Sequence, residues 1–260
     1  MPPEEFATSA SIVIIGAGAA GLCAALAAHE AGVAEVIVLE RDSLPRGSTA
    51  LSSGLIPAAG TRFQRAHGIG DSPSLFAADI RQKAHGEPDA TIVERIAQEA
   101  GSAIEWLADR HGLPFSLVHN FDYPGHSERR MHGLPSRSGA ELIDRLRQAA
   151  DEAAFPLVLN ATVHALYADG RGRIGGVEII RPDGAVDRLG CQALILACSG
   201  YGATPIWSRI TFPKCAAQPI LVTLATAVMR CDGEERSVQN SSTCRVIRGT
   251  ARWRIHMGCS

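Results

Sequence analysis

The most regular hydrophobic pattern in the chain covers Ser11–Glu40, where two apolar runs flank a glycine-rich turn and an alanine-rich segment. The first run, Ile12–Ile15, is apolar at every position, which is typical of a strand covered on both faces in a parallel sheet. The pattern then predicts a helix over Ala19–Ala31 that ends at Gly32, and a second strand over Glu35–Leu39. The order strand, turn, helix, strand predicts a βαβ unit.

Amphipathic helices are predicted in the middle of the chain. Asp71-Ser72-Pro73 combines a capping residue with a proline at the first helical position, so a helix should begin there and run to about His85. A second helix should follow Pro88-Asp89 and end at Gly112, and a third should cover Gly139–Ala154. The residues expected on the buried faces of these last two helices are Ile92, Ile96, Ala100, Ile104 and Leu107, and Leu142, Ile143 and Leu146. Such stripes indicate core packing rather than cofactor binding.

From Leu157 onwards the pattern changes to short β-rich runs separated by turn signals at Asp169-Gly170 and Pro182-Asp183-Gly184. We expect a strand at Leu157 that returns to the main sheet, an antiparallel insertion around Gly175–Arg188, and a last buried strand over Ala193–Ala197. Together these elements predict an α/β fold, with a doubly wound parallel sheet and a small antiparallel insertion.

The turn after the first strand has the spacing G-x-G-x-x-G, formed by Gly16, Gly18 and Gly21. Gly16 makes the tight turn, Gly18 lets the backbone approach a pyrophosphate, and Gly21 allows close packing of helix and strand. The phosphates are expected at the N-terminus of the following helix, where free N–H groups and the helix dipole favour negative charge. Glu40, at the end of the second strand, is placed to accept hydrogen bonds from a ribose hydroxyl. The alternative is an ordinary glycine-rich βαβ turn, and the complete set of strands, helix and terminal acid speaks against it.

Two loops are rich in side chains that can bind ligands. Arg41–Gly60 carries small and hydroxylated residues, whose hydroxyls and N–H groups can wrap a ligand. A flexible surface loop is the less favoured alternative, because several apolar residues between Leu51 and Pro57 would be costly to expose together. The second loop, His119–Gly139, offers Arg130 and His132 for anion or proton contacts in a pocket. For this loop, a solvated segment without a functional role stays open as the alternative.

Composition narrows the class of protein. A chain of 260 residues can hold one or two domains, and its net charge of -2 gives no electrostatic basis for binding nucleic acid. No apolar run reaches about 18 residues, and the N-terminus lacks the basic region of an export signal, so we expect a cytoplasmic protein without a membrane span. Seven cysteines without a C-x-x-C pair indicate reduced thiols and no metal site.

Residues 11–202 resemble the flavoprotein family of fumarate reductases and succinate dehydrogenases, which includes soluble FAD-dependent reductases and ketosteroid dehydrogenases. The matching motifs are GAGAAG with Glu40, GSTALSSG from Gly47 to Gly54, RRMHGLPSRSGAELIDRL, the strand at Ala161–Val163, and ILACSGYG from Ile195 to Gly202. The resemblance implies a doubly wound FAD-binding domain over residues 1–202. It also implies an extended FAD, with its adenosine near Glu40 and Val163 and its flavin over the Ser48–Gly54 loop.

The family's chemistry is hydride transfer between flavin N5 and an activated C–C bond of a small-molecule substrate, so the resemblance implies an FAD-dependent oxidoreductase. FAD should be bound non-covalently, because no histidine stands near Gly47-Ser48-Thr49, where some family members attach it. The residues expected to bind FAD, from the pattern and the resemblance together, are Gly16, Gly18, Ala19, Ala20, Gly21, Glu40, Arg41, Ser48, Thr49, Ser52, Ser53, Gly54, Val163, Ser199 and Gly200.

Two other functional classes stay open. One is a flavin-binding fragment that is catalytically inactive. The other is a Rossmann enzyme that uses NAD, which is disfavoured because Gly47–Gly54 and Ser199-Gly200 match motifs of FAD domains. The sequence names neither the catalytic residues nor the electron donor.

The resemblance stops after Gly202. Family members continue with a helix of the type N-P-E-L-V-A-R and later a capping domain, whereas this chain continues with a tail that has no clean helical or strand period. When the tail is back-translated and each codon is read from its third base, Thr204–Lys214 permits N-P-D-L-V-A-x-H-I-P-E-M, and Thr223–Arg236 and Arg245–Cys259 permit similar family-like strings. We therefore expect residues 203–260 to be a frame-shifted tail, natural or from sequencing, with the capping domain missing. The alternative is a divergent C-terminal domain.

Overall fold

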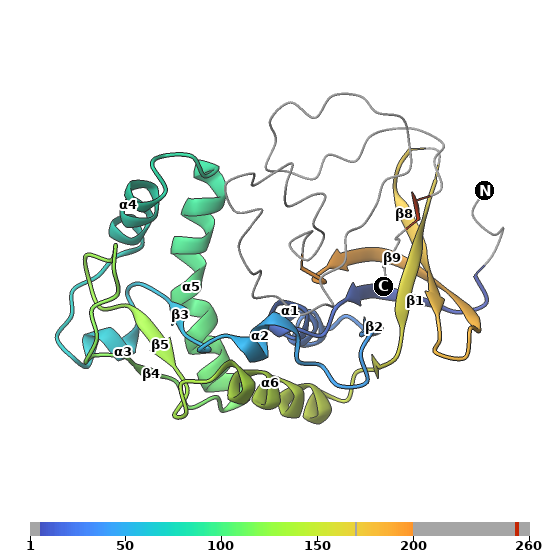
Figure 1. Cartoon of the computed structure of the whole chain (residues 1–260), viewed down its shortest axis with the longest axis horizontal. Coiled ribbons are helices and arrows are strands. Elements are labelled where there is room, and N and C mark those ends of the chain that lie inside the picture. Colours follow the sequence, from blue (N-terminus) through green and yellow to red (C-terminus); the bar gives the residue numbers. More distant parts are fainter. Residues whose placement is uncertain (1–5, 170, 200–252, 255–260) are drawn as a thin grey trace, which may run out of the picture. The chain divides into compact units, whose positions relative to one another are not determined.

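The computed structural model describes residues 6–169, 171–199 and 253–254, which Figure 1 shows in colour. The chain forms two compact units. The first contains Met1–Leu51 and Leu146–Ser260, and the second contains Ser52–Arg145. No helix in the described part of the chain is long and apolar enough to cross a membrane.

The first unit is built on a seven-stranded sheet with the order β10-β7-β8-β9-β1-β2-β6. Its central strand is β1 (Ser9–Ile15), which pairs in parallel with β2 (Val36–Leu39) and with β9 (Val186–Leu196). β6 (Leu157–Val158) extends the parallel part beyond β2. The predicted strands, including the one that returns to the sheet at Leu157, are present. The expectation that the last strand is buried over Ala193–Ala197 was wrong, because its residues are exposed or only partly buried in the described structure, and Leu196 is 49% exposed.

Helix α1 (Ala19–Glu30) joins β1 to β2 and packs against both strands. It begins directly after the glycine turn, and its inward face buries Leu22 and Leu26. The chain leaves the helix through Gly32, whose φ of 81° lies in the left-handed region that favours glycine. The βαβ unit predicted from Ser11–Glu40 is therefore confirmed.

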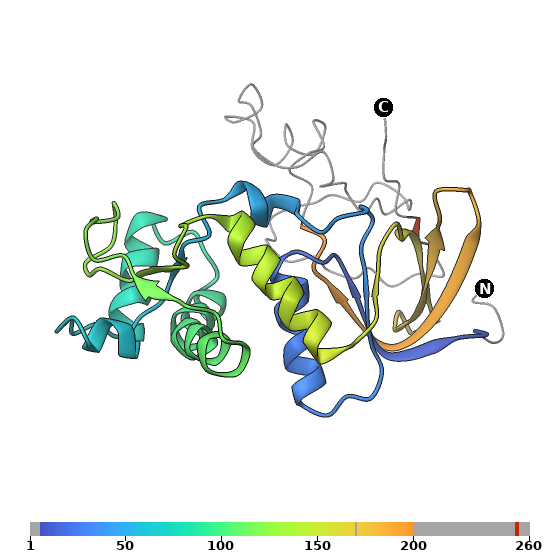
Figure 2. The ribbon, with the colours of Figure 1, turned by 90° about the horizontal axis from the view of Figure 1, so that it is seen from below.

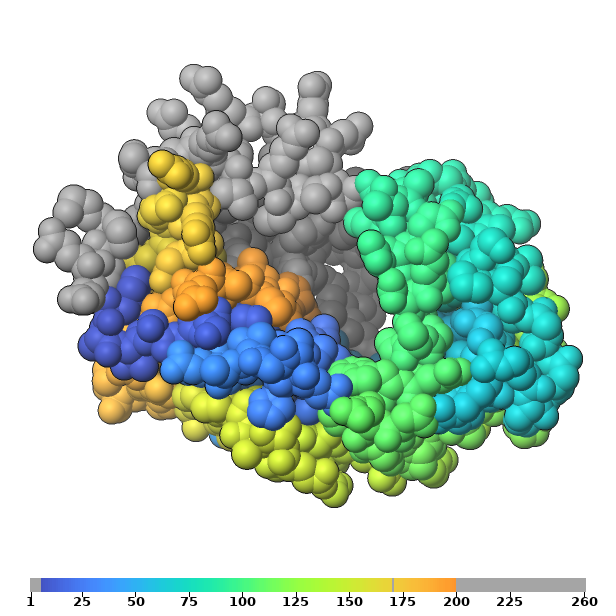
Figure 3. All heavy atoms as spheres, turned by 180° about the vertical axis from the view of Figure 1, so that it is seen from behind, coloured from blue at the N-terminus to red at the C-terminus, as the bar shows by residue number. Residues whose placement is uncertain are grey.

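The antiparallel insertion is a meander of three strands, β7 (Thr162–Ala168), β8 (Ile174–Ile180) and the first half of β9. β9 changes its partner along its length: Val186–Gly190 pairs with β8, and Gly190–Leu196 pairs with β1. Figure 2 shows β9 (orange) as one long strand beside β1 (dark blue), and Figure 3 shows the same two segments as neighbours on one face. The two halves of the sheet thus share one continuous strand.

Buried residues of the parallel strands and of the meander form a single apolar cluster. Val13 and Ile15 of β1 pack in the same cluster as Val163 of β7 and Val177 and Ile179 of β8. The short strand β10 (Trp253–Arg254) pairs antiparallel with β7 at the outer edge of the meander.

The second unit combines helices with a three-stranded antiparallel sheet. The sheet has the order β3 (Ile56–Pro57), β5 (Met131–Gly133), β4 (Ser116–Leu117). The helices are α3 (Arg62–Arg65), α4 (Pro73–Lys83) and α5 (Ala90–His111), and α4 packs against α5. The predicted helix ends are confirmed, because Ser72 and Asp89 cap α4 and α5 through their side chains and Gly112 closes α5 at φ 65°.

The predicted buried face of α5 was wrong in its first half. Ile92 and Ile96 are 50% and 52% exposed, and the helix instead buries Val93, Ala97 and Gly101 ahead of Ile104 and Leu107. The reason lies at Gly101, where an added Cβ would stand 2.7 Å from the carbonyl oxygen of Ala59. The helix backbone approaches the Ala59 segment closely at Gly101, so this face of the helix is buried. A glycine contributes nothing to the hydrophobic pattern, which therefore does not show that its face is buried.

The described residues include two further helices. The short helix α2 (Gly47–Leu51) belongs to the first unit. Helix α6 (Gly139–Ala153) starts in the second unit and ends in the first. Leu142, Ile143 and Leu146 of α6 are buried, as predicted.

Candidate cofactor site

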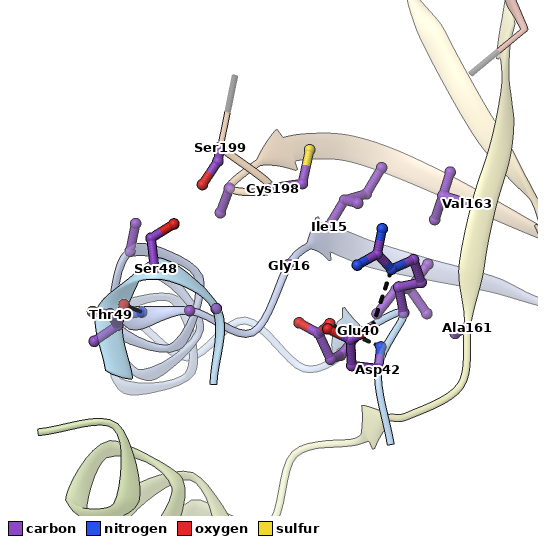
Figure 4. A pocket seen from close by; sticks show the side chains of 17 residues that line it. Ile15, Gly16, Glu40, Asp42, Ser48, Thr49, Ala161, Val163, Cys198 and Ser199 are labelled. Carbon is purple, nitrogen blue, oxygen red and sulfur yellow. Dashed lines mark hydrogen bonds and ion pairs between the residues drawn. The ribbon is translucent and has the colours of Figure 1, made fainter. Parts of the chain in front are cut away.

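A pocket of about 150 Å³ lies in the first unit, at the carboxyl ends of β1, β2 and β9 (Figure 4). This is the edge of an open α/β sheet where ligands bind. Ten of the residues predicted from the sequence line it: Gly16, Gly18, Ala19, Ala20, Glu40, Arg41, Ser48, Thr49, Val163 and Ser199.

The three glycines of the turn have different physical reasons to be glycine. An added Cβ on Gly16 would stand 2.7 Å from the carbonyl oxygen of Ala197, and one on Gly21 would stand 1.9 Å from that of Gly16. At both positions the protein's own backbone leaves no room for a side chain. On Gly18 the nearest atom is Thr49 Oγ1 at 3.6 Å, an ordinary contact, and its φ of -72° is open to any residue. The described structure therefore gives no internal reason for a glycine at 18, which leaves close approach of a ligand.

The N-terminus of α1 opens into the same pocket. Gly18 occupies the capping position and supplies no side chain, although the first N–H groups of a helix have no partner within it. The N–H of Ala19 donates to Thr49 Oγ1 at 3.1 Å. This hydroxyl fixes α2 against the turn and leaves the helix end suited to an anion.

Glu40 has a role in the fold that the sequence did not reveal. Its Oε2 accepts the N–H of Ala17 at 2.8 Å, and its Oε1 accepts the N–H of Asp42 at 3.0 Å. The carboxylate thus ties the end of β2 to the glycine turn. Because each carboxylate oxygen can accept a second hydrogen bond, the predicted role toward a ribose hydroxyl remains available.

Beyond Glu40 the pocket has an apolar wall with a charged pair beside it. The wall is formed by Ala161, just before β7, and by Val163 in β7. The Arg41 Nε donates to Asp42 Oδ1 at 3.2 Å, and both side chains are partly exposed. A flat apolar group with polar edges, such as a nucleobase, suits this end of the pocket.

Cys198 also lines the pocket, beside Ser199 at the end of β9, and was missed from the sequence. Burial raises the pKa of its thiol, and the negative charge of Glu40 raises it further, so the thiol stays protonated at neutral pH. Its position just after a predicted strand could have indicated a place in the pocket. It was missed because a cysteine next to an apolar run is usually a core residue.

The predicted residues Ser52, Ser53 and Gly54 belong to the second unit and are absent from the pocket lining. Gly54 has a local reason to be glycine: its φ is 63°, and an added Cβ would stand 2.7 Å from the carbonyl oxygen of Ser138. Its N–H donates to Ser52 Oγ at 3.1 Å. A role of these three residues toward a cofactor stays a prediction. Of the other predicted residues, Gly21 packs beneath the turn, and Gly200 lies outside the described residues.

Arg130 and His132 do not line the pocket described above, and their positions fit neither alternative for their loop, a ligand pocket or a solvated segment. Both are fully buried in the second unit. Arg130 forms ion pairs with Asp71 at 2.9 Å and with Asp79, and His132 Nε2 lies 2.8 Å from Thr61 Oγ1. Buried charges are paired in proteins because an unpaired one is costly, and here the pairing fixes β5 to α4. Among the described residues no cluster of three or more histidine, cysteine or acidic side chains could hold a metal ion.

The predicted frame-shifted tail lies almost wholly outside the described residues. Only the backbone of Trp253–Arg254 is described, as strand β10.

Comparison with known proteins gives consistent matches. The protein-family model described as an FAD binding domain matches residues 11–257. The chain is 30% identical over 191 residues to a probable fumarate reductase of Shewanella frigidimarina, covering 74% of this chain and 32% of that protein. It is 30% identical over 203 residues to a urocanate reductase of Eggerthella lenta, covering 77% of this chain and 33% of that protein.

Among solved structures, the open conformation of a flavocytochrome c3 fumarate reductase superposes with a TM-score of 0.75 at 27% identity. The match covers 82% of this chain and 37% of that one. The chain therefore spans about a third of the length of these relatives.

Proposed function

Because the chain belongs to the family of FAD-binding domains found in fumarate reductase and succinate dehydrogenase flavoproteins, with FAD as its cofactor, we propose that the pocket at the ends of β1, β2 and β9 holds the adenosine and diphosphate of FAD. We propose further that the whole protein is an oxidoreductase acting on an activated C–C bond of a small molecule. Names of the relatives, which include fumarate and urocanate reductases, support this reaction class.

One observation carries the placement of FAD: Gly18 has no reason within the described protein to be glycine. Its Cα faces the pocket at the N-terminus of α1, where a diphosphate gains from both the free N–H groups and the helix dipole. A second observation agrees with it, because Ser48 Oγ is buried in the pocket lining and has no hydrogen-bond partner in the described part of the chain. The residues present therefore fit the cofactor.

The roles of the side chains follow from their places in the pocket. Glu40 accepts hydrogen bonds from the ribose, since its carboxylate has acceptor capacity left after binding two backbone N–H groups. Ala161 and Val163 contact the adenine. When bound, FAD supplies hydride chemistry at its flavin ring. The pocket residues bind and orient the cofactor, and the groups that act on the substrate belong to the rest of the protein.

Substitutions of Gly18 and Gly21 test this placement as a matched pair. Gly18→Ala should leave the thermal stability of the FAD-free protein nearly unchanged, because the new methyl group meets only an ordinary contact. It should abolish FAD binding, measured by retention of flavin absorbance and by titration with FAD. Gly21→Ala should instead destabilise the protein, because its Cβ would overlap the carbonyl oxygen of Gly16. Normal FAD affinity in a folded Gly18→Ala protein would contradict the placement.

Catalytic activity is a separate question from binding. An inactive flavin-binding fragment is the alternative, and turnover with a reduced dye as electron donor and fumarate as acceptor distinguishes it from an active reductase. The cytoplasmic location is also a proposal. So is the absence of a nucleic-acid partner, which the weakly acidic net charge of -2 supports.

A further inference from the structure

The second unit has a pocket of its own, separate from the cofactor pocket. It measures about 440 Å³ and lies between the end of α4 and the loop that follows Tyr123. Apart from one glycine, its lining residues are polar or charged: Asp79, Gln82, Lys83, His85, Gly125, His126 and Ser127. All of them lie within Ser52–Arg145, so the pocket belongs to one compact unit. None of them belongs to the proposed FAD site.

Asp79 fixes the loop side of this pocket. Its Oδ2 accepts the N–H of Ser127 at 2.8 Å, and its Oδ1 accepts the Ser127 hydroxyl at 2.5 Å. Oδ2 also pairs with Arg130. Among the described residues that line the pocket, Asp79 is the only acid, and both of its oxygens are engaged. The carboxylate therefore ties the loop to α4 and presents no free negative charge to the pocket.

His126 brings a buried, unpaired nitrogen to the pocket. Its Nδ1 has no hydrogen-bond partner among the described residues. The ring packs against Phe76 and Tyr123, with centroid distances of 6.1 Å and 5.2 Å, so its orientation is fixed by aromatic contacts. A buried polar atom without a partner lowers stability. Because His126 lines the pocket, a ligand there can supply the missing partner.

The end of α4 supplies positive charge and further donors. Lys83 lies in the last turn of the helix, and His85 follows it. The stem of Lys83 crosses the loop at Gly125, where an added Cβ would stand 3.0 Å from Lys83 Cδ. Gly125 thus leaves room for the stem and keeps the lysine beside the pocket. The lining combines one ammonium group with two imidazoles.

This set of groups suits a small tetrahedral oxyanion. Ammonium and imidazole N–H groups are donors, and lysine is a common partner of phosphate. A planar carboxylate prefers the fork of an arginine, and none of the described residues that line this pocket is an arginine. A metal ion is disfavoured, because the described residues contain no cluster that could hold one and Asp79 is already engaged.

Two effects oppose an anion here, and both are limited. The C-terminus of a helix repels negative charge, but the carbonyl oxygens of Ile80 and Arg81 already accept the N–H groups of Ala84 and Gly86. The buried ion-pair cluster beside the pocket has one carboxylate more than guanidinium, through Asp71. The lysine in the pocket lining offsets that charge.

We propose that this pocket binds a small tetrahedral oxyanion of the phosphate type, with His126 Nδ1, the Lys83 ammonium and the His85 imidazole as donors. Such an anion pairs the buried nitrogen and joins the end of α4 to the loop, so its binding should stabilise the second unit. The site is independent of the proposed FAD site, and each can fail without the other.

The test is calorimetric titration of the full chain with inorganic phosphate, at an ionic strength kept constant with sodium chloride. Lys83→Met removes the charge and keeps an unbranched apolar stem over Gly125, and His126→Gln removes the imidazole. Arg95→Met is the control for loss of an exposed cation, since Arg95 pairs with Glu99 on α5. His119→Gln is the control for loss of an exposed histidine outside the pocket lining.

The wild type should bind phosphate saturably, with a Kd of about 1 mM or below. Lys83→Met and His126→Gln should each raise this Kd roughly 10-fold or more, since each removes a hydrogen bond to a charged group. The two controls should change it little. Phosphate should raise the melting temperature of the wild type more than that of Lys83→Met. The Kd for FAD should be the same in all of these proteins.

Sulfate provides a second readout, because its charge does not change between about pH 6 and 8. The charged and titratable groups that face His126 are Asp71, Asp79 and Arg130 from the buried cluster, Tyr123 from its own loop, and Lys83 and His85 from the end of α4. Burial and Arg130 lower the pKa of His126, and a bound anion favours its charged form. Sulfate should therefore bind more tightly at pH 6 than at pH 8, and this difference should shrink in His126→Gln.

Three results would overturn the proposal. One is the absence of saturable phosphate binding up to about 10 mM. Another is an equal loss of affinity in the pocket variants and the controls, which would show a general effect of surface charge. The third is tighter binding of succinate than of phosphate, which would assign the pocket to carboxylates. Wild-type protein that binds phosphate but not FAD would contradict the proposed function and support this site.

Discussion

Glu40 serves the fold and the cofactor site with the same carboxylate. Its two oxygens accept the N–H groups of Ala17 and Asp42, so the glycine turn depends on this side chain even without a ligand. The sequence motif predicts only the ribose contact, because the motif is defined by the residues that bind the ligand. The hydrogen bonds that Glu40 makes within the turn become visible only in the structure. A change at Glu40 should therefore affect stability as well as affinity.

We predict that Glu40→Gln destabilises the FAD-free protein by about 1 to 3 kcal/mol, because the amide NH₂ can no longer accept the N–H that it faces and leaves it unpaired. The measurement is urea unfolding followed by circular dichroism. Glu35→Gln is the control, since Glu35 is an exposed acid just before β2 and should change stability little. A variant that unfolds like the wild type but binds FAD more weakly would restrict Glu40 to the ribose contact.

At the scale of elements, a network of buried polar side chains holds the second unit together. Arg130, just before β5, pairs with Asp71 before α4 and with Asp79 on α4. Asp79 also accepts the N–H of Ser127 at 2.8 Å. His132 on β5 contacts Thr61, the cap of α3. Sequence patterns predicted the helices of this unit but could not predict the network, because its members are brought together only by tertiary packing.

The protonation of His132 is fixed by its partners. Its Nδ1 lies 2.9 Å from the carbonyl oxygen of Arg130, which can only accept, so Nδ1 carries the proton and Nε2 accepts from the Thr61 hydroxyl. Burial lowers the pKa of His132 below the ordinary value of 6.5. Burial and the charge of Arg130 likewise lower the pKa of His126, although Asp79 and Asp71 act against this. Both histidines are therefore neutral in the folded protein at pH 7.

We predict that the second unit loses stability as the pH falls below about 6.5. Between 6.5 and the lower pKa of each folded histidine, the unfolded chain binds more protons than the folded one, so acid favours unfolding. A further loss follows below about pH 3.8, because the pKa of Asp79 is lowered: burial raises it, but the hydrogen bonds from Ser127 and Arg130 together outweigh burial. Hydrogen exchange of amides in residues 52–145 at pH 7.5 and 5.5, corrected for intrinsic rates, measures the first loss.

His126→Gln provides the comparison for this pH dependence. It removes one of the two histidines at a position that is only partly buried, so the variant should fold and should lose less stability between pH 7.5 and 5.5 than the wild type. Equal stability of the wild-type unit at both pH values would contradict the prediction.

At the scale of the whole molecule, the parts predicted well were those with strong local signals. The βαβ unit, the helix caps and the returning strand at Leu157 each depend on residues close together in sequence. The buried side of α5 depends on the approach of Ala59, and the place of Cys198 depends on the pairing of β9 with the distant β1. Neither contact leaves a periodic signal in the sequence. Pocket residues were predicted where a glycine or an acidic residue follows a strand, as at Gly16 and Glu40. The pocket residue Cys198 was missed because a cysteine after a strand carries no such signal.

We predict that the tail from Ala203 to Ser260 is frame-shifted and completes no active site, because a segment without selection for packing should show conflicting local patterns. Almost all of this segment lies outside the described residues, and the expected result is the absence of reductase turnover. A gene with the frame restored near the codon for Ala203 should give a protein with reductase activity. Reductase turnover by the present chain, or an unshifted reading frame on resequencing across the codons for Gly202 to Pro205, would contradict this prediction.

The shared strand β9 also decides the order in which the molecule can be assembled. The β7–β8–β9 meander joins neighbours in sequence, so its loops close quickly. β1 can pair early with β2, but its other edge must wait for β9, where Ile15 meets Leu196. During synthesis, β1 and the glycine turn leave the ribosome long before β9 exists. The floor of the pocket, where Gly16 rests against Ala197, therefore forms late, and the cofactor can be loaded only after nearly the whole described chain has been made.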